Sequence, residues 1–340
     1  MWEQGGAFAG AGLGTVAAPG DLSGDGIEDL VSSAVGRGEV FVYYGSGSGF
    51  AEQPDVTVAD GTFQRRFGAT LPVFGQLNEG GDLSVAIGAP QESGQDVDGA
   101  VYIWFGSPED GDQPTDADLV IGDSNNGAFG GLNNSDSGDL NADGHLDLAF
   151  GVPSQDEVDV FFGPFGAGVN LDVADADVRV ASSSGGDFGS DLATGDLDGD
   201  GYQDVLISDV DGPGAVHLFV GGSGFSGNYS ASDAATVIGG SSGDRGIGTF
   251  AEVADSDGNG VDDLLVGSSE GDGYGALFYG PLGTRSSVDQ ADAEFAGFED
   301  QGCFEFAALT DTNGDASADL VISCSLPFPG STYIVLGRGE

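Results

Sequence analysis

An aspartate-rich loop recurs along this chain, and each copy leads directly into a short apolar strand. Its form is Asp-x-Asp/Asn-x-Asp/Asn-Gly-x-x-Asp, although Ser23 replaces the third residue of the first copy and Ala316 replaces the glycine of the last. With one degenerate copy included, successive loops start 55 to 63 residues apart. A unit that recurs at this spacing is expected to fold as a structural repeat. The loops start at Asp21, Gln76, Asp139, Asp196, Asp255 and Asp311.

The loop carries the groups that a hard cation of calcium size requires. Oxygen ligands stand at alternate positions, a glycine permits a sharp turn, and a carboxylate closes the loop. A helix-flanked calcium loop has a glutamate at position twelve, whereas this chain has apolar residues there, such as Phe150 and Ile207. The loop is therefore expected to enter a β-strand and not a helix.

We expect the first, third, fifth and ninth side chains and the seventh backbone carbonyl to face the cation. A single Asp-Gly-Asp stretch is typical of a solvated turn, but repetition in register favours about four to five bound Ca2+ ions. Ser23 and Ala316 predict weaker binding in the first and last loops. The loop at Gln76 keeps Asn78 but is predicted to be metal-free, because glycine and serine replace its other ligands. The predicted ligands are Asp21, Ser23, Asp25, Ile27, Asp29, Asp139, Asn141, Asp143, His145, Asp147, Asp196, Asp198, Asp200, Tyr202, Asp204, Asp255, Asp257, Asn259, Val261, Asp263, Asp311, Asn313, Asp315, Ser317 and Asp319.

Four strand-like segments recur around each loop. A Phe-Gly pair, such as Phe67-Gly68 or Phe188-Gly189, is assigned to the first strand, and an apolar second strand such as DLAFGV follows the loop. The third segment begins and ends with glycine, as in GEVFVYYG, and the fourth is short, as in Asp118-Leu-Val-Ile. Four strands joined by Gly- and Asp-rich turns predict one blade of an all-β propeller. No segment shows helical periodicity.

Phe-Gly, the aspartate-rich loop and a Gly-Ala-Pro-like turn, as in Gly88-Ala89-Pro90, follow one another within the repeats. This order resembles the FG-GAP repeat of integrin α-subunit propellers. The segments GPFGAGVNLDVADADV and GPLGTRSSVDQADAEF resemble bacterial integrin-like FG-GAP repeat proteins more closely still. The resemblance covers nearly the whole chain. It implies a propeller with calcium in the five loops on its lower face and partner binding on its upper face.

One propeller domain is expected over 1–340. Its six repeats are placed at approximately 1–54, 55–117, 118–176, 177–234, 235–292 and 293–340. Integrin-like propellers usually have seven blades, so two interpretations stay open. Six blades close into a ring with a short strand that contains Trp2, which we favour, or the chain is cut from a longer protein.

The net charge limits the environment and the partners. The chain has 57 acidic residues against 7 Lys and Arg, and its formal charge is -50. Such self-repulsion requires screening by cations or salt, so an extracellular or cell-surface location is expected, and a halophilic cytoplasm also fits. Nucleic acid and anionic membranes are excluded as partners, and no membrane insertion is expected. With 39% hydrophobic residues, the chain has enough apolar side chains to fold, as a monomer.

The sequence shows neither a signal peptide nor a transmembrane run, and because such proteins are usually exported we take Met1 as the start of a fragment. Cys303 and Cys324 stand on either side of the last loop. If the segments around that loop form an antiparallel hairpin, the two cysteines lie opposite each other and a disulfide is possible. The alternative is a pair of buried thiols.

The loops expected on the upper face carry four of the chain's arginines. Together with one phenylalanine they form a candidate partner-binding patch, because arginine and aromatic residues dominate binding hot spots. Ion pairing with nearby aspartates on a solvated rim is the alternative. The candidate partner-binding residues are Arg37, Phe63, Arg65, Arg66 and Arg245.

An enzyme is not expected. His145 falls within a calcium loop and His217 within an apolar strand, and the sequence has no nucleophile elbow, zinc spacing or phosphate loop. The predicted function is a calcium-binding, non-catalytic interaction or cell-adhesion module that binds a protein on its upper face. A carbohydrate-binding propeller with a glycan partner is the alternative, and a polysaccharide-degrading enzyme is less expected.

Overall fold

The structure is a computed structural model, and its described part is built from β-strands and short 3-10 turns. No α-helix occurs among the described residues, which confirms the all-β prediction, and none of them forms a helix that could cross a membrane. The described residues are 13–61, 66–70, 73–90, 99–122, 135–183, 185, 187–240, 247–268, 273–296, 303–310, 317–324, 331–335 and 337.

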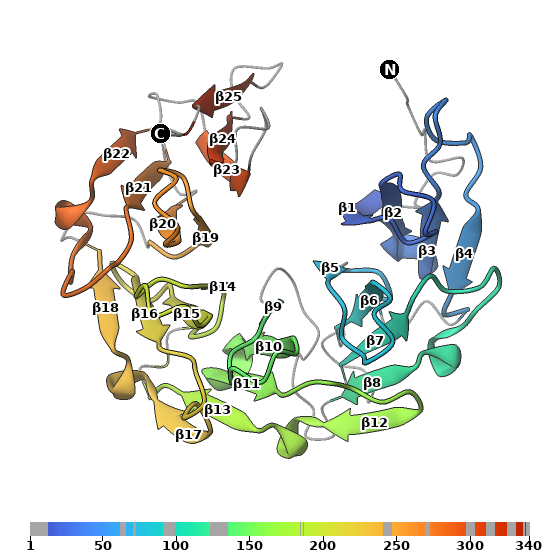
Figure 1. The fold of residues 1–340 in the computed structure, drawn as a ribbon, viewed down its shortest axis with the longest axis horizontal. Coiled ribbons are helices and arrows are strands. Elements are labelled where there is room, and N and C mark those ends of the chain that lie inside the picture. Colours follow the sequence, from blue (N-terminus) through green and yellow to red (C-terminus); the bar gives the residue numbers. More distant parts are fainter. Residues whose placement is uncertain are drawn as a thin grey trace. The chain divides into compact units, whose positions relative to one another are not determined.

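The chain divides into two compact units. Unit 1 comprises Met1–Ser137, His145–Ser154 and Asp159–Asp177, and unit 2 comprises Gly138–Gly144, Gln155–Val158 and Val178–Glu340. Each unit is described by itself below, with the strands labelled in Figure 1.

Unit 1 contains two sheets in which consecutive strands pair antiparallel. The first sheet is β1 (Leu13–Gly20), β2 (Asp29–Ala34), β3 (Glu39–Tyr43) and β4 (Val56–Ala59). The second is β5 (Val73–Phe74), β6 (Ser84–Ala89), β7 (Ala100–Phe105) and β8 (Leu119–Gly122), joined by β12 (Val169–Asp172). Three further strands lie between β8 and β12 in the sequence: β9 (Ser135–Gly138), β10 (Asp147–Val152) and β11 (Glu157–Phe161). The boundary between the two units falls within β9 and within β11.

Unit 2 contains three further sheets and one parallel strand pair. The pair is β13 (Val178–Ala181) and β17 (Gly227–Ser230). The first sheet is β14 (Leu192–Gly195), β15 (Asp204–Asp209), β16 (Ala215–Phe219) and β18 (Thr236–Gly239). The second is β19 (Phe250–Ala254), β20 (Asp263–Ser268), β21 (Tyr274–Phe278) and β22 (Ala293–Ala296), and the third is β23 (Cys303–Thr310), β24 (Asp319–Cys324) and β25 (Ser331–Val335).

Three of these sheets have the strand order that the repeat pattern predicts, with each aspartate-rich loop between the first and second strands. Four-stranded antiparallel sheets of this kind are consistent with propeller blades. Each sheet also includes the short outer strand that opens the next predicted repeat, so β4 (Val56–Ala59) pairs with β3 and not with the strands that follow it. The number of blades and the closure of a ring stay predictions.

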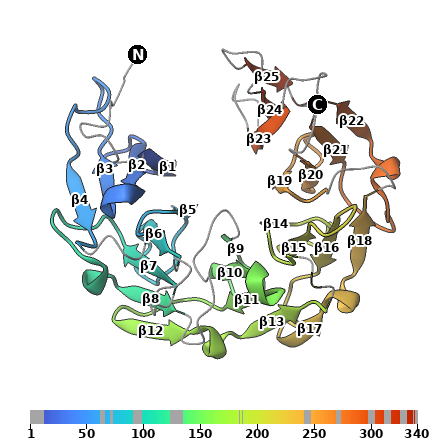
Figure 2. The same cartoon turned by 180° about the vertical axis from the view of Figure 1, so that it is seen from behind.

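A fifth strand, which the sequence analysis did not predict, extends the second sheet. β12 runs parallel to β8, with Val169 opposite Leu119, and it lies on the outer side of that sheet (Figures 1 and 2). β17 pairs with β13 in the same parallel way. In both cases the added strand lies near the end of the same predicted repeat that its partner strand opens, so the two ends of one predicted repeat pair with each other.

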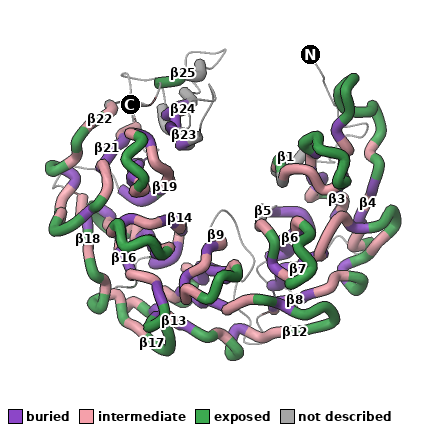
Figure 3. Tube along the Cα trace, in the orientation of Figure 1, coloured by how far each residue is buried: buried purple, intermediate pink, exposed green. Residues whose placement is uncertain are grey.

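The second and third strands of the sheets form most of the core. All six residues of β6, β10 and β20 are buried, as Figure 3 shows in purple. Continuous apolar strands of this kind are typical of sheets covered on both faces.

The Phe-Gly pairs lie in the turn before the first strand, so their assignment to the strand itself was wrong. Phe67 and Phe188 are fully buried, while Gly68 and Gly189 have φ values of 81° and 84°. Phe129-Gly130 lies outside the described residues. Only a residue without a Cβ adopts such a left-handed turn at low cost, and a strand requires negative φ.

Candidate metal centre

The ninth residue of every aspartate-rich loop is the first residue of the second strand of its sheet or, in the loop from Asp139, of β10. Five of the six loops have an aspartate at this position, and the loop from Gln76 has Ser84. All five of these side chains are buried: Asp29, Asp147, Asp204, Asp263 and Asp319. A buried carboxylate must be compensated, either by hydrogen bonds or by a cation.

Hydrogen bonds within the loop fix the carboxylate of the first residue. In the loop from Asp196, one carboxylate oxygen accepts the N–H groups of Gly199 at 2.8 Å and Asp200 at 3.1 Å, and the other accepts Gly201 at 2.9 Å. The first residues of the loops from Asp21 and Asp255 accept the same three N–H groups of their own loops. The glycines at the fourth and sixth positions turn the chain, with φ of 81° at Gly199 and 89° at Gly201.

Three carboxylates converge at two of the loops. In unit 2, oxygens of Asp196, Asp198 and Asp204 lie within 4.8 Å of one another. The same holds for Asp255, Asp257 and Asp263. Among the described residues these are the groups of three acidic side chains with that spacing, and they are the first, third and ninth residues of their loops. Oxygens that converge in this way suit a hard divalent cation.

Hydrogen bonds link the fifth and seventh residues of three of the loops. Asp200 accepts the N–H of Tyr202 at 2.9 Å, and Asn259 accepts the N–H of Val261 at 2.7 Å. The fifth residue therefore orients the seventh, whose carbonyl was predicted to bind. The first loop repeats this bond between Asp25 and Ile27, at 2.9 Å.

The loops from Asp139 and Asp311 differ from this pattern. In the former, Asn141 stands in the third position and donates from its amide to Asp143, at 3.1 Å. Its fourth residue, Ala142, has a φ of 63°, so an alanine occupies the left-handed conformation that glycine has in three other loops. Asp311, Asn313 and Asp315 lie outside the described residues, whereas Ser317 and Asp319 are described and buried.

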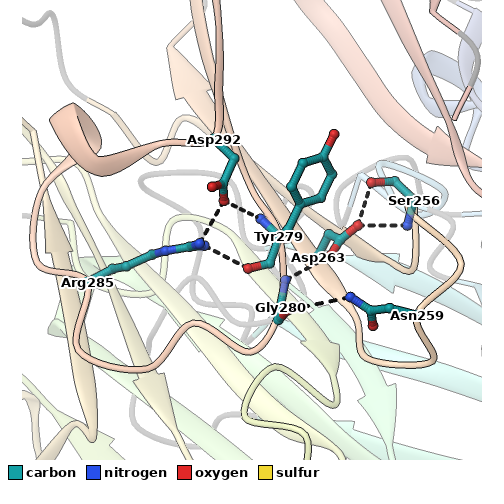
Figure 4. A network of polar contacts seen from close by, with 7 residues as sticks. All are labelled: Ser256, Asn259, Asp263, Tyr279, Gly280, Arg285 and Asp292. Atoms are coloured by element: carbon teal, nitrogen blue, oxygen red, sulfur yellow. Dashed lines mark hydrogen bonds and ion pairs between the residues drawn. The ribbon is translucent and has the colours of Figure 1, made fainter. Parts of the chain in front are cut away.

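The ninth aspartate also ties the loop to the end of the third strand. Asp204 accepts the N–H groups of Leu197 and Gly221, both at 3.0 Å. Asp263 makes the equivalent bonds to Ser256 and Gly280, at 2.8 Å each, and the Ser256 hydroxyl donates to it as well (Figure 4). The donors Gly221 and Gly280 are the glycines that end the third segments in the sequence.

Sterics require glycine at these positions, since any residue except proline could supply the backbone N–H. A Cβ on Gly221 would lie 1.9 Å from the carbonyl oxygen of Gln203, and one on Gly280 would lie 2.3 Å from that of Asp262. Gly45, Gly163 and Gly337 meet the residue before the ninth aspartate of their own loops in the same way, at 2.2, 2.3 and 2.4 Å. The peptide therefore approaches the loop closely enough for its N–H to reach the carboxylate.

The same peptide is also held from the outer strand. Asp292 accepts the N–H of Tyr279, at 2.8 Å, while Arg285 donates to the Tyr279 carbonyl at 2.7 Å and forms an ion pair with Asp292, also at 2.7 Å (Figure 4). Polar contacts thus run from the loop carboxylate of Asp263, through the peptide before Gly280, to the edge of the sheet.

Burial raises the pKa of three of the clustered carboxyls. Burial raises the pKa of Asp204 to about 7, with Asp198 and Asp200 adding repulsion, although the N–H groups of Gly221 and Leu197 oppose the shift. Burial likewise raises the pKa of Asp198 and of Asp263. Ionised carboxylates in such a site become favourable when a divalent cation binds between them. The pKa of Asp21 is instead lowered, chiefly by the N–H of Gly26.

The degenerate loop from Gln76 has different hydrogen bonds. Asn78 accepts the N–H groups of Gly80 at 3.0 Å and Gly81 at 3.2 Å, so its oxygen is used within the loop. Ser84 replaces the ninth aspartate, and the N–H of Gly106 donates to the Leu83 carbonyl at 2.9 Å. The prediction that this loop is metal-free stays a prediction.

Of the candidate partner-binding residues, Arg37 and Arg66 are described and Phe63, Arg65 and Arg245 lie outside the described residues. Arg37 ends the 3-10 turn between β2 and β3 and pairs with Glu39 at 2.9 Å. The partner in this ion pair is a glutamate, whereas the alternative interpretation named aspartates. Arg66 has a φ of 52° in the turn that leads to Phe67. The patch as a whole stays a prediction.

Two residues near the metal loops were missed by the sequence analysis. Gln203 and Asp262 occupy the eighth position of their loops, where the pattern places no ligand. Each accepts a hydrogen bond from the first residue of the preceding loop, at 2.7 Å for Asp139 and 2.8 Å for Asp196. Burial raises the pKa of Asp262, and the N–H groups of Asp196 and Asp255 partly offset that shift. Their polar side chains, where three of the other loops have leucine or alanine, were the available signal.

Comparison with known proteins supports the resemblance seen in the sequence. Residues 188–219 match the FG-GAP repeat. The chain is 34% identical to integrin alpha-4 of Xenopus laevis over 165 residues, which is 45% of this chain and 15% of that protein. It is 39% identical to integrin alpha-D of Homo sapiens over 92 residues, which is 26% of this chain and 8% of that protein. The matched segments thus span less than a sixth of these two relatives.

A solved structure supports the fold alone. The crystal structure of BBS1N in complex with ARL6DN aligns with 97% of this chain and 84% of that chain, with a TM-score of 0.52 and 13% sequence identity. Residues 188–219 thus match an FG-GAP repeat, parts of the chain are similar to integrin alpha subunits, and the strand order agrees with propeller-type repeats. The greater similarity to bacterial FG-GAP repeat proteins stays a prediction.

Proposed function

We propose that the chain is a calcium-stabilised, non-catalytic interaction or adhesion module. Calcium is bound by the first, third, fifth and ninth side chains and the seventh carbonyl of the aspartate-rich loops, and a partner protein is bound by loops at the opposite ends of the strands. The observation that carries the proposal is the convergence of three carboxylates within 4.8 Å in each of two loops.

Calcium has a structural role in this proposal. The ninth aspartate joins the loop to the third strand through two buried N–H bonds, so a cation held by that aspartate rigidifies both segments. Metal binding that organises a loop contributes its free energy to folding. Each cation also removes repulsion among carboxylates in a chain of formal charge -50.

The adhesion part rests on the similarity to integrin alpha subunits, and it includes a location outside the cell or at the cell surface. The proposed domain is the one propeller over 1–340, and protein surfaces are its proposed partners.

Titration of calcium into chelator-treated protein by isothermal calorimetry tests the proposal. The variants Asp198→Ala and Asp257→Ala each remove one of the converging carboxylates, and each is expected to lose one calcium site per chain. Asp289→Ala, a change in the 3-10 turn before β22, is the control and keeps every site. A wild-type chain that takes up no calcium, or variants that keep the full number of sites, would contradict the proposal.

A further inference from the structure

The eighth residue of one aspartate-rich loop holds the first residue of the preceding loop. In unit 2, the N–H of Asp196 donates to the carboxylate of Asp262 at 2.8 Å, and the N–H of Asp262 donates to the carbonyl of Asp196 at 3.0 Å. Both backbone polar groups of Asp196 are therefore bonded to one residue of the next repeat. Asp196 is the first calcium ligand of its loop, and Asp262 immediately precedes Asp263, the ninth ligand of the next loop.

The equivalent position is polar in one other pair of loops. Gln203 accepts the N–H of Asp139 at 2.7 Å, with a neutral amide in place of the carboxylate. In both pairs the residue before the first ligand is a glycine that makes room for this side chain. A Cβ on Gly195 would lie 2.7 Å from the Asp262 carboxylate, and one on Gly138 would lie 2.5 Å from the Gln203 amide oxygen.

The two earlier pairs of loops replace this polar link by an apolar contact. Leu83 and Leu146 occupy the eighth position there, and their methyl groups would lie 3.2 and 2.6 Å from a Cβ on Gly20 and Gly75. The side-chain link is therefore found at the Asp139 and Asp196 loops and is not a necessity of the repeat, since Ala318 occupies the eighth position of the last loop.

A second route joins the same two loops. The N–H of Gly280 donates to Asp263 at 2.8 Å (Figure 4), and two residues further on the N–H of Leu282 donates to the carbonyl of Leu197 at 2.9 Å. Leu197 is fully buried. The first two residues of the Asp196 loop are thus positioned by the repeat that carries the Asp255 loop.

We propose that Asp262 couples the calcium sites of the Asp196 and Asp255 loops, so that the two sites fill cooperatively. A cation bound by Asp263 fixes the backbone at Asp262, and Asp262 then holds Asp196 where its carboxylate meets the first cation. Coupling of this kind is reciprocal, so occupancy of either loop favours the other. Asp262 acts as a positioning residue and is not itself a ligand. The inference rests on the proposed calcium binding.

Terbium luminescence gives a readout of one loop. Terbium has the size and oxygen preference of calcium, and it emits when a tyrosine beside it is excited. Tyr202 is the seventh residue of the Asp196 loop and is 48% exposed, whereas the other described loops with a predicted site have Ile27, His145, Val261 and Ser317 at that position. The emission that disappears in Tyr202→Phe therefore reports the Asp196 loop.

The experiment is a double-mutant cycle on the full chain. Asp257→Ala removes a ligand from the Asp255 loop, and we expect it to weaken terbium binding at the Asp196 loop about tenfold, within the range of coupled sites. In the Asp262→Ala background the same change is expected to weaken binding less than about twofold. Asp262→Asn keeps an acceptor, as Gln203 does, so there the tenfold effect is expected to remain. Asp25→Ala, which removes a ligand from a loop of unit 1, is the matched control. It is expected to leave terbium binding at the Asp196 loop unchanged.

The outcomes separate the two proposals. If Asp257→Ala weakens the Asp196 loop equally with and without Asp262, or has no effect while terbium still binds, the coupling is overturned and calcium binding stands. Loss of the tenfold effect in Asp262→Asn also overturns the coupling, because that variant keeps the acceptor on which the coupling depends. This variant can be measured even if Asp262→Ala fails to fold. If wild-type protein shows no Tyr202-dependent emission, the proposed calcium site and the coupling both fall.

Discussion

Replacing Gly221 by alanine tests whether the close approach of the third strand to the metal loop supports the fold. The new Cβ would lie 1.9 Å from the carbonyl oxygen of Gln203 and 3.0 Å from that of Leu140. All of these are backbone atoms, so relief requires the end of β16 to move away from the loop. That movement stretches the bond from Gly221 to Asp204 and the bond from Gly222 to Leu140, which are 3.0 and 2.8 Å long.

The expected loss of stability follows from these contacts. Two net hydrogen bonds contribute about 0.5–1.5 kcal/mol each, and forcing an extra methyl group into a packed site costs about 1–3 kcal/mol. The sum is about 2–6 kcal/mol of unfolding free energy. With an unfolding entropy of roughly 2.1 cal/mol/K per residue, this corresponds to a drop in Tm of about 3–8 °C if the chain melts as one unit.

The assay is thermal unfolding followed by circular dichroism in millimolar calcium. Gly224→Ala is the matched control, because Gly224 lies in the same turn, has no heavy atom within 4 Å of an added Cβ and does not have a positive φ. Gly224→Ala is expected to melt with the wild type. If Gly221→Ala melts at the same temperature as Gly224→Ala, the reasoning about the close approach is refuted.

Three further results are expected. Asp198→Ala should lower the Tm measured in calcium and leave the Tm in chelator nearly unchanged, because its carboxylate contributes through the cation; equal losses in both buffers would contradict this. Burial raises the pKa of Asp204 to about 7, from an unfolded value near 3.9. The contribution of Asp204 to the stability of calcium-free protein is therefore present below pH 4 and is lost as the pH rises through 7. Calcium affinity should fall as the pH drops below 7, because protons then compete with the cation for this carboxylate. The difference between wild type and Asp204→Asn isolates this effect from the general repulsion of the chain, and a difference that does not change between pH 5 and pH 8 would exclude it. Cys303 and Cys324 are Cα partners in the register of β23 and β24, so peptide mapping without reductant should recover them as one cross-linked peptide, and two free thiols would favour the alternative.

Much of the fold could be predicted from the sequence, because local chemistry sets it. The loop pattern, the apolar second strand and the glycine-bounded third strand each repeat, and the paired strands lie where these segments were placed. Cys303 was expected opposite Cys324 if a hairpin formed, and the register confirms that pairing. The first strand was misplaced by a few residues, because Phe67 is as apolar as a strand residue although Gly68 turns the chain.

Contacts between segments far apart in the sequence could not be predicted in this way. The parallel strands β12 and β17 have mixed exposed and half-buried residues, so no alternation distinguishes them from a loop. Asp262 and Gln203 have the composition of solvated loop residues, and their role appears only when residues 66 and 64 positions apart meet. The ligand positions within a loop were readable because they depend on spacing along one short segment.

The count of calcium ions per chain at saturation, measured by elemental analysis after equilibrium dialysis, tests the central claim most directly. The account predicts about four to five ions per wild-type chain, with one fewer in Asp198→Ala. Less than one ion per chain would show that the carboxylates of Asp196, Asp198 and Asp204 converge without a cation, and the aspartate-rich loops would then be acidic turns and not calcium sites.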